Sequence, residues 1–154
     1  MKLNYILIPL FALSVAGAGS LVTSRGMEWY KKINLPDFTP PGSFIGTVWT
    51  IIFILSAISA IMVWNKALHN QKFWIIIGLF ILNGLLNFFW SYLFFGKQQI
   101  FGALFEIIPL EVSVVTLMIL IWPLSRLASL LLLPYAGWVA FASYLNYLIW
   151  TLNK

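Results

Sequence analysis

The sequence predicts an all-α polytopic membrane protein, a bundle of five transmembrane helices in one domain that covers residues 1–154. Of its residues, 62% are hydrophobic and only 8% are charged, whereas a soluble domain carries about 25% charged residues. So few charged side chains cannot solvate a surface of this size, and most of the surface must face lipid. Five apolar runs, each long enough to cross a bilayer core of about 30 Å, are separated by polar segments.

The first predicted helix covers residues 5–24. A cleavable signal peptide is the alternative interpretation, because Lys2 precedes an apolar run that ends in the small residues Ala16, Gly17 and Ala18. The apolar run continues beyond that point to Val22, so we expect a retained span. Its small residues would let another helix or a ligand approach the backbone closely.

Residues 25–43, RGMEWYKKINLPDFTPPGS, form the longest polar segment. Pro36, Pro40 and Pro41 prevent a continuous helix here, and Trp29 and Tyr30 suit the membrane–water interface. A loop of this length between two spans is typical of a lid or a binding element. We therefore predict a lid loop over residues 25–43.

The other four helices are predicted at residues 44–64, 73–95, 100–122 and 127–150. The connections between them are short, so successive helices should pack as antiparallel neighbours. Pro134 lies within the last run and is expected to kink it.

An unusual polar stripe marks the third helix. Asn83, Asn87 and Trp90 are spaced i, i+4 and i+7, which places them on one helical face. An amide that faces lipid would lack hydrogen-bond partners, so this stripe should face protein or a cavity.

Two further stripes contain large rings. Trp49 and Phe53 lie one turn apart in the second helix, and Trp138, Ala142 and Leu145 share a face of the fifth. Taken singly, each of these residues could simply pack helix against helix. Taken together with Asn87 and Trp90, they predict a pocket for a large, flat, mostly apolar molecule.

Few residues offer conventional catalytic chemistry. Glu106 and Glu111 are intramembrane acids and therefore candidates for function, but they lie about 140° apart around a helix and form no carboxylate pair. The single histidine, His69, lies in a polar loop, and the chain has no cysteine. No metal site and no resident cofactor are therefore predicted. The net charge of +5 is dispersed through loops, which favours contact with membrane lipids over nucleic acid.

Three segments carry a resemblance to a known family. PPGSFIGTVWT, LNFFWSYLFFGKQQ and LPYAGWVAFASYLNYLIW resemble motifs of the translocator protein family, also called the tryptophan-rich sensory protein (TspO/MBR) or peripheral-type benzodiazepine receptor family. The resemblance extends from the first helix to the last and is closest to bacterial members. It implies a five-helix homodimer in the bacterial cell membrane that binds protoporphyrin IX and benzodiazepine- or isoquinoline-carboxamide-type ligands.

The resemblance also assigns residues. It implies that the pocket is lined by Trp49, Asn87, Trp90, Trp138 and Ala142, with Tyr30 and Pro41 on the side of the lid. The cholesterol-recognition pattern is incomplete, because Lys154 lies one residue too far beyond Tyr147. A sterol is therefore not the expected ligand. Gly102 stands where animal members have a tryptophan, so drug affinity is expected to differ from theirs.

Two functions follow as hypotheses. The favoured one is tetrapyrrole transport or stress sensing, in which a porphyrin is held in the pocket. The alternative is light-dependent oxidative degradation of protoporphyrin IX, with Trp49 and Trp138 as the participating residues. A metal-free porphyrin is itself a photosensitiser and needs no histidine ligand, which is compatible with both hypotheses.

Overall fold

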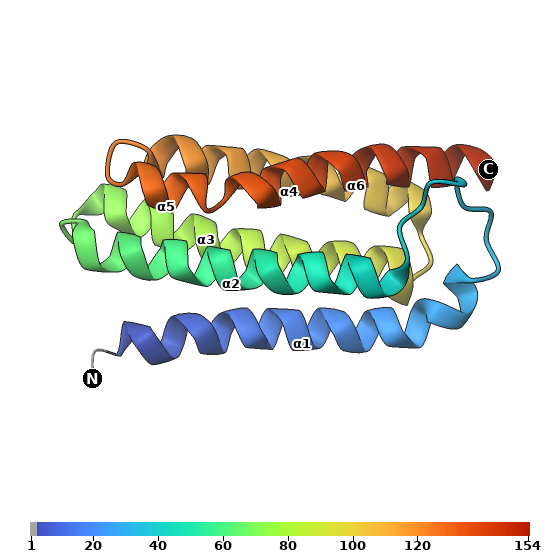
Figure 1. The fold of residues 1–154 in the computed structure, drawn as a ribbon, viewed down its shortest axis with the longest axis horizontal. Helices are drawn as coiled ribbons and strands as arrows, with labels where there is room; N and C mark the ends of the chain where they lie inside the picture. Colours follow the sequence, from blue (N-terminus) through green and yellow to red (C-terminus); the bar gives the residue numbers. More distant parts are fainter. Residues whose placement is uncertain (1–2) are drawn as a thin grey trace.

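A computed structural model describes residues 3–154 and shows an all-helical chain (Figure 1). Within these residues there is no strand, and five segments are long and apolar enough to cross a membrane, which confirms the predicted fold class. The helical elements are α1 (Asn4–Tyr30), α2 (Gly42–Lys66), α3 (Gln71–Ser91), the π-helical turn η1 (Tyr92–Gly96), α4 (Ile100–Ile121), α5 (Arg126–Leu130) and α6 (Leu133–Leu152). The third span comprises α3 and η1, and the fifth comprises α5 and α6.

The helices run side by side along the long axis of the molecule, and the two ends of the chain lie at opposite ends of the bundle (Figure 1). This placement is what five successive spans require. The core joins α2, α3, α4 and α6, where Val63, Ile76, Val114 and Val139 are fully buried. α1 lies at the edge of the bundle, where it contacts α2, α3 and η1 (Figure 1).

α1 continues six residues beyond its predicted end and reaches Tyr30. The lid loop is correspondingly shorter than predicted and covers residues 31–41. The physical reason is that all three prolines of the polar segment lie beyond residue 35, so nothing before Lys31 interrupts the helical hydrogen bonds.

A close helix contact anchors the extended end of α1. Gly26 is buried, and a Cβ atom placed on it would lie 2.5 Å from the carbonyl oxygen of Phe95 and 2.9 Å from its Cα atom. The absence of a side chain therefore lets α1 approach the backbone of η1 directly.

The fifth span is interrupted rather than kinked. α5 ends at Leu130, and Pro134 lies in the first turn of α6, where its missing N–H costs no hydrogen bond. Hydroxyl groups hold α5 in place, because Ser59 Oγ donates to the Ala128 carbonyl over 2.7 Å and Ser129 Oγ donates to the Met118 carbonyl over 2.8 Å.

Gly26→Ala is expected to lower the stability of the protein by about 1–3 kcal/mol, because the added methyl group must displace the backbone of Phe95. Gly17→Ala is the matched control, since it lies on the exposed side of the same helix with no atom within 4 Å of an added Cβ. The measurement is the midpoint of thermal unfolding in detergent. Equal midpoints for the two variants would contradict the close contact.

Candidate ligand-binding cavity

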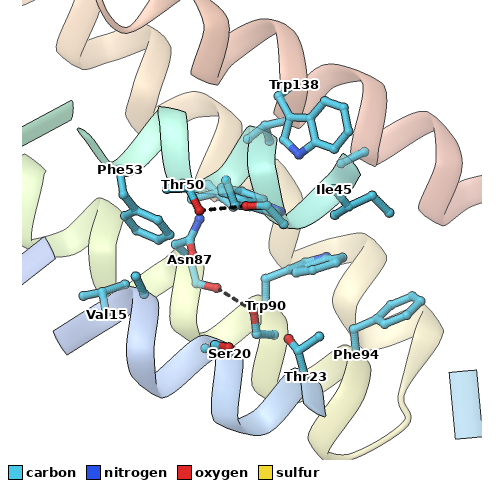
Figure 2. A pocket seen from close by; sticks show the side chains of 18 of the residues that line it. Val15, Ser20, Thr23, Ile45, Thr50, Phe53, Asn87, Trp90, Phe94 and Trp138 are labelled. Carbon is cyan, nitrogen blue, oxygen red and sulfur yellow. Dashed lines mark hydrogen bonds between the residues drawn. The ribbon is translucent and has the colours of Figure 1, made fainter. Parts of the chain in front are cut away.

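A cavity of about 730 Å³ lies inside the bundle, bounded by α1 and α2 on one side and by α3, α4 and α6 on the other. Its volume falls within the range of about 300–1,000 Å³ that is typical of small-molecule pockets. Figure 2 shows Phe53, Asn87, Trp90 and Trp138 turned toward this space from three different helices.

Most of the residues predicted to bind a ligand line this cavity. They are Tyr30, Trp49, Phe53, Asn87, Trp90, Trp138, Ala142 and Leu145. Pro41 and Asn83 do not line it. Pro41 is exposed and caps the start of α2. Asn83 instead faces α4, where its Nδ2 donates to Ser113 Oγ over 2.8 Å.

The rings of the cavity support one another at aromatic contact distances. Trp49 meets Tyr135 edge to face with 5.9 Å between ring centroids, and Trp90 stacks on Phe94 at 5.2 Å. Trp138 contacts Phe141 at 5.3 Å. Each such pair contributes about 0.5–1.5 kcal/mol beyond the burial of its area, so the indoles are held in fixed orientations.

Asn87 is the principal polar group of the inner wall. Its Nδ2 donates to the hydroxyl oxygen of Tyr135 over 3.1 Å, and both residues are buried. Its amide oxygen accepts no hydrogen bond from residues 3–154, although the residue lines the cavity. The arrangement thus offers a ligand one oriented acceptor.

Trp138 supplies the complementary donor. Its indole Nε1 is buried and has no acceptor within the described chain. Trp90 differs, because its Nε1 donates to Asn146 Oδ1 over 3.2 Å, and Asn146 Nδ2 in turn donates to the Ile100 carbonyl over 3.1 Å. Trp90 therefore presents only its ring, whereas the Trp138 N–H is unpaired and covered by neighbouring atoms.

Several wall residues were missed by the sequence analysis. α1 contributes Ser20 and Thr23, η1 contributes Phe94, and α4 contributes Ile107 and Leu110. The small residues of α1 did signal a close approach, and Gly19 and Ala16 indeed line the cavity. The apolar contributions of α4 left no distinguishing signal, because they look like any other core positions.

The remaining candidates lie elsewhere. Glu106 and Glu111 do not line the cavity. Glu106 is 7% exposed, and neither of its carboxylate oxygens has a hydrogen-bond donor among residues 3–154. His69 lies in the loop between α2 and α3, with Nε2 3.2 Å from the Trp64 carbonyl oxygen. In the part of the chain that the structure describes, no three His, Cys, Asp or Glu side chains gather as a metal site.

The lid loop is fastened to the end of α6. The backbone N–H of Asn34 donates to Asn153 Oδ1 over 2.9 Å, and Asn153 Nδ2 donates to the Asn34 carbonyl over 2.8 Å. Phe38 stacks on Tyr144 with 6.3 Å between ring centroids. These contacts hold the lid loop against the end of α6.

Five membrane-spanning helices around an aromatic cavity define an integral membrane protein with an internal pocket of ligand size. The chain belongs to the TspO/MBR family, whose model matches residues 5–151. This match confirms the family resemblance found in the sequence.

Named relatives come from archaea, bacteria and animals. The chain is 39% identical to the tryptophan-rich protein TspO of Archaeoglobus fulgidus over 145 residues, which cover 94% of this chain and 93% of the relative. It is 30% identical to the tryptophan-rich protein TspO of Bacillus cereus, with 99% of both chains covered. It is 29% identical to the human translocator protein, with 86% of this chain and 79% of the relative covered.

Tyr135→Phe is expected to lower stability by about 1 kcal/mol, because the Asn87 amide loses the oxygen to which it donates inside the bundle. Tyr147→Phe is the control, since Tyr147 is 47% exposed and its hydroxyl makes no hydrogen bond within residues 3–154. Thermal unfolding in detergent measures both variants. If Tyr135→Phe matched the control, the hydrogen bond would not contribute to the fold.

Proposed function

We propose that the protein binds porphyrins, with protoporphyrin IX as the chief ligand, and that it also accepts benzodiazepine- and isoquinoline-carboxamide-type molecules. The observation that carries the proposal is the cavity itself, in which Trp49, Trp90 and Trp138 supply ring faces around about 730 Å³. A flat tetrapyrrole matches this combination of stacking surface and volume.

The polar groups of the cavity fit such a ligand as well. The amide oxygen of Asn87 can accept from a ring N–H, and the unpaired Nε1 of Trp138 can donate to a carboxylate or carbonyl once the indole turns to uncover it. The residues that line the cavity include neither a histidine nor a cysteine. A metal-free porphyrin needs no such ligand to its centre.

The physiological role that we infer is tetrapyrrole transport or stress sensing. Membership of the TspO/MBR family supports it, because the resemblance described above implies porphyrin binding for the family. We further propose that the protein acts as a homodimer in the bacterial cell membrane, surrounded by membrane lipids. Sterol binding is not part of the proposal, because Tyr147 faces outward and its recognition pattern is incomplete.

Ala142→Phe is expected to weaken protoporphyrin IX binding by about ten-fold or more, because a ring at this position occupies the space the ligand needs. Ala140→Phe is the matched control, since Ala140 is exposed and lies two residues earlier on the same helix. Titration of porphyrin fluorescence in the dark gives both dissociation constants. Equal affinity in the two variants would argue against this cavity as the binding site.

The alternative function is light-dependent oxidation of the bound porphyrin. The observation that favours it is that Trp49 and Trp138 line the same cavity, so both indoles would lie beside a bound macrocycle. In this reaction the excited porphyrin is the reductant and dissolved dioxygen is the oxidant.

The double variant Trp49→Phe, Trp138→Phe tests this alternative. Provided that it still binds the porphyrin, illumination in air should leave the absorption spectrum of the bound ligand unchanged, whereas the wild-type protein should convert it to a new product. Unchanged light-driven turnover of the porphyrin in the double variant would refute the alternative and leave binding as the function.

A further inference from the structure

Away from the lid end, the cavity reaches the outer surface of the bundle only between α1 and α2, as far as the described residues show. Apart from Gly42 at the lid end, six residues both line the cavity and are exposed at the surface. They are Leu13 and Ser20 of α1 and Gly46, Thr50, Ile54 and Ile58 of α2. The wall residues of α3, α4 and α6 are all buried or half-buried. We call the line along which these six residues face one another the α1–α2 seam.

The α1–α2 seam faces the hydrocarbon of the bilayer. Leu13 is 69% exposed, Ile54 is 55% exposed and Ile58 is 42% exposed, and all three belong to membrane-spanning helices. Outward-facing apolar side chains on membrane-spanning helices lie in the hydrocarbon of the bilayer. The opening of the cavity therefore lies toward the membrane interior.

Hydrogen bonds join α1 to α2 only near one end of the seam. There Asn4 Nδ2 donates to Asn65 Oδ1 over 3.3 Å, and Asn65 Nδ2 donates to the Tyr5 hydroxyl over 2.9 Å. At the other end the two helices are joined by the lid loop. Between these points, within the described residues, no side-chain hydrogen bond crosses from α1 to α2.

Small residues keep the α1–α2 seam open toward its lid end. A Cβ atom placed on Gly46 would have no atom within 4 Å, so the backbone of α2 borders free space there. Ser20 offers a hydroxyl that makes no hydrogen bond within residues 3–154, and the Thr50 hydroxyl donates only to the Gly46 carbonyl of its own helix, over 2.9 Å. An apolar slot with a few hydroxyls suits an amphiphilic ring system.

The lid end of the bundle differs from the α1–α2 seam, because contacts of the lid loop fasten it. The Asn34–Asn153 pair fastens the loop to α6 with two hydrogen bonds of 2.8 and 2.9 Å, and Phe38 stacks on Tyr144. Among the described wall residues at this end, only Gly42 is exposed at the surface. A ligand dissolved in the bilayer meets the α1–α2 seam directly.

We propose that the ligand enters and leaves the cavity from the bilayer, sideways between α1 and α2 through the α1–α2 seam. The inference rests on the proposed function and narrows its ligand class to flat amphiphiles that partition into membranes. In antiparallel register, Ser20 and Thr50 lie at about the same depth on opposite sides of the seam. The two residues are therefore suited to a bridge that closes it.

The test exploits the absence of cysteine from the chain. Ser20→Cys and Thr50→Cys are introduced together, and a short bifunctional methanethiosulfonate bridges them in a form that a reductant reverses. The lid is locked separately by a disulfide in the Asn34→Cys, Asn153→Cys variant. Both proteins are placed in phosphatidylcholine vesicles, and binding of protoporphyrin IX is followed by quenching of tryptophan fluorescence in stopped flow.

Bridging the seam is expected to slow both association and dissociation by about ten-fold or more, with recovery on reduction, whereas locking the lid leaves both rates unchanged. Slowing by the lid lock alone would overturn the proposal and place the route at the lid. A rise in the dissociation rate alone on bridging would also overturn it, because Ser20 and Thr50 would then belong to the binding wall. Absence of saturable binding in the unmodified protein would instead refute the proposed function itself.

Discussion

Inside a bilayer no water is available to pair with a polar group, and this constraint determines how the helices of the protein are joined. A buried amide is therefore stabilised when it finds a hydrogen-bond partner on a neighbouring helix. Asn83 donates a hydrogen bond to Ser113 of α4, and Asn87 donates one to Tyr135 of α6. Trp90 donates to Asn146 of α6, whose amide donates in turn to the Ile100 carbonyl of α4. These bonds tie α3, α4 and α6 into one block. The same bonds orient the side chains of the inner cavity wall, so the stability of the block and the geometry of the site have a common origin.

The outer wall of the cavity, formed by α1 and α2, contains fewer side-chain hydrogen bonds between its helices. α1 and α2 share side-chain hydrogen bonds only where Asn4 and Tyr5 meet Asn65, and elsewhere they contribute mostly apolar and small residues. α1 is nevertheless fixed against η1 by the close approach at Gly26. A rigid inner wall thus faces an outer wall whose middle is free of cross-links. This difference can reconcile a preformed aromatic pocket with the passage of a large ligand, because only one wall has to move.

Hydropathy and helical spacing were sufficient to predict the class of fold, because a span must be long, apolar and continuous. They also predicted which residues share a helix face, which is why Asn87, Trp90, Trp138 and Ala142 were selected. They could not reveal which neighbour each face meets. Asn83 lies on the predicted stripe but faces Ser113, because the partner helix is set by packing between distant segments. The predicted end of α1 is six residues too early, because polar residues are typical of a loop although no proline interrupts the helix there.

The central claim is that the cavity between the two walls holds a flat tetrapyrrole. The most direct measurement is an experimental structure of the protein crystallised from lipid with protoporphyrin IX. We expect density for the macrocycle inside the cavity, between Trp49 and Trp138. A macrocycle bound on the outside of the bundle, with the cavity empty or filled by lipid, would contradict it.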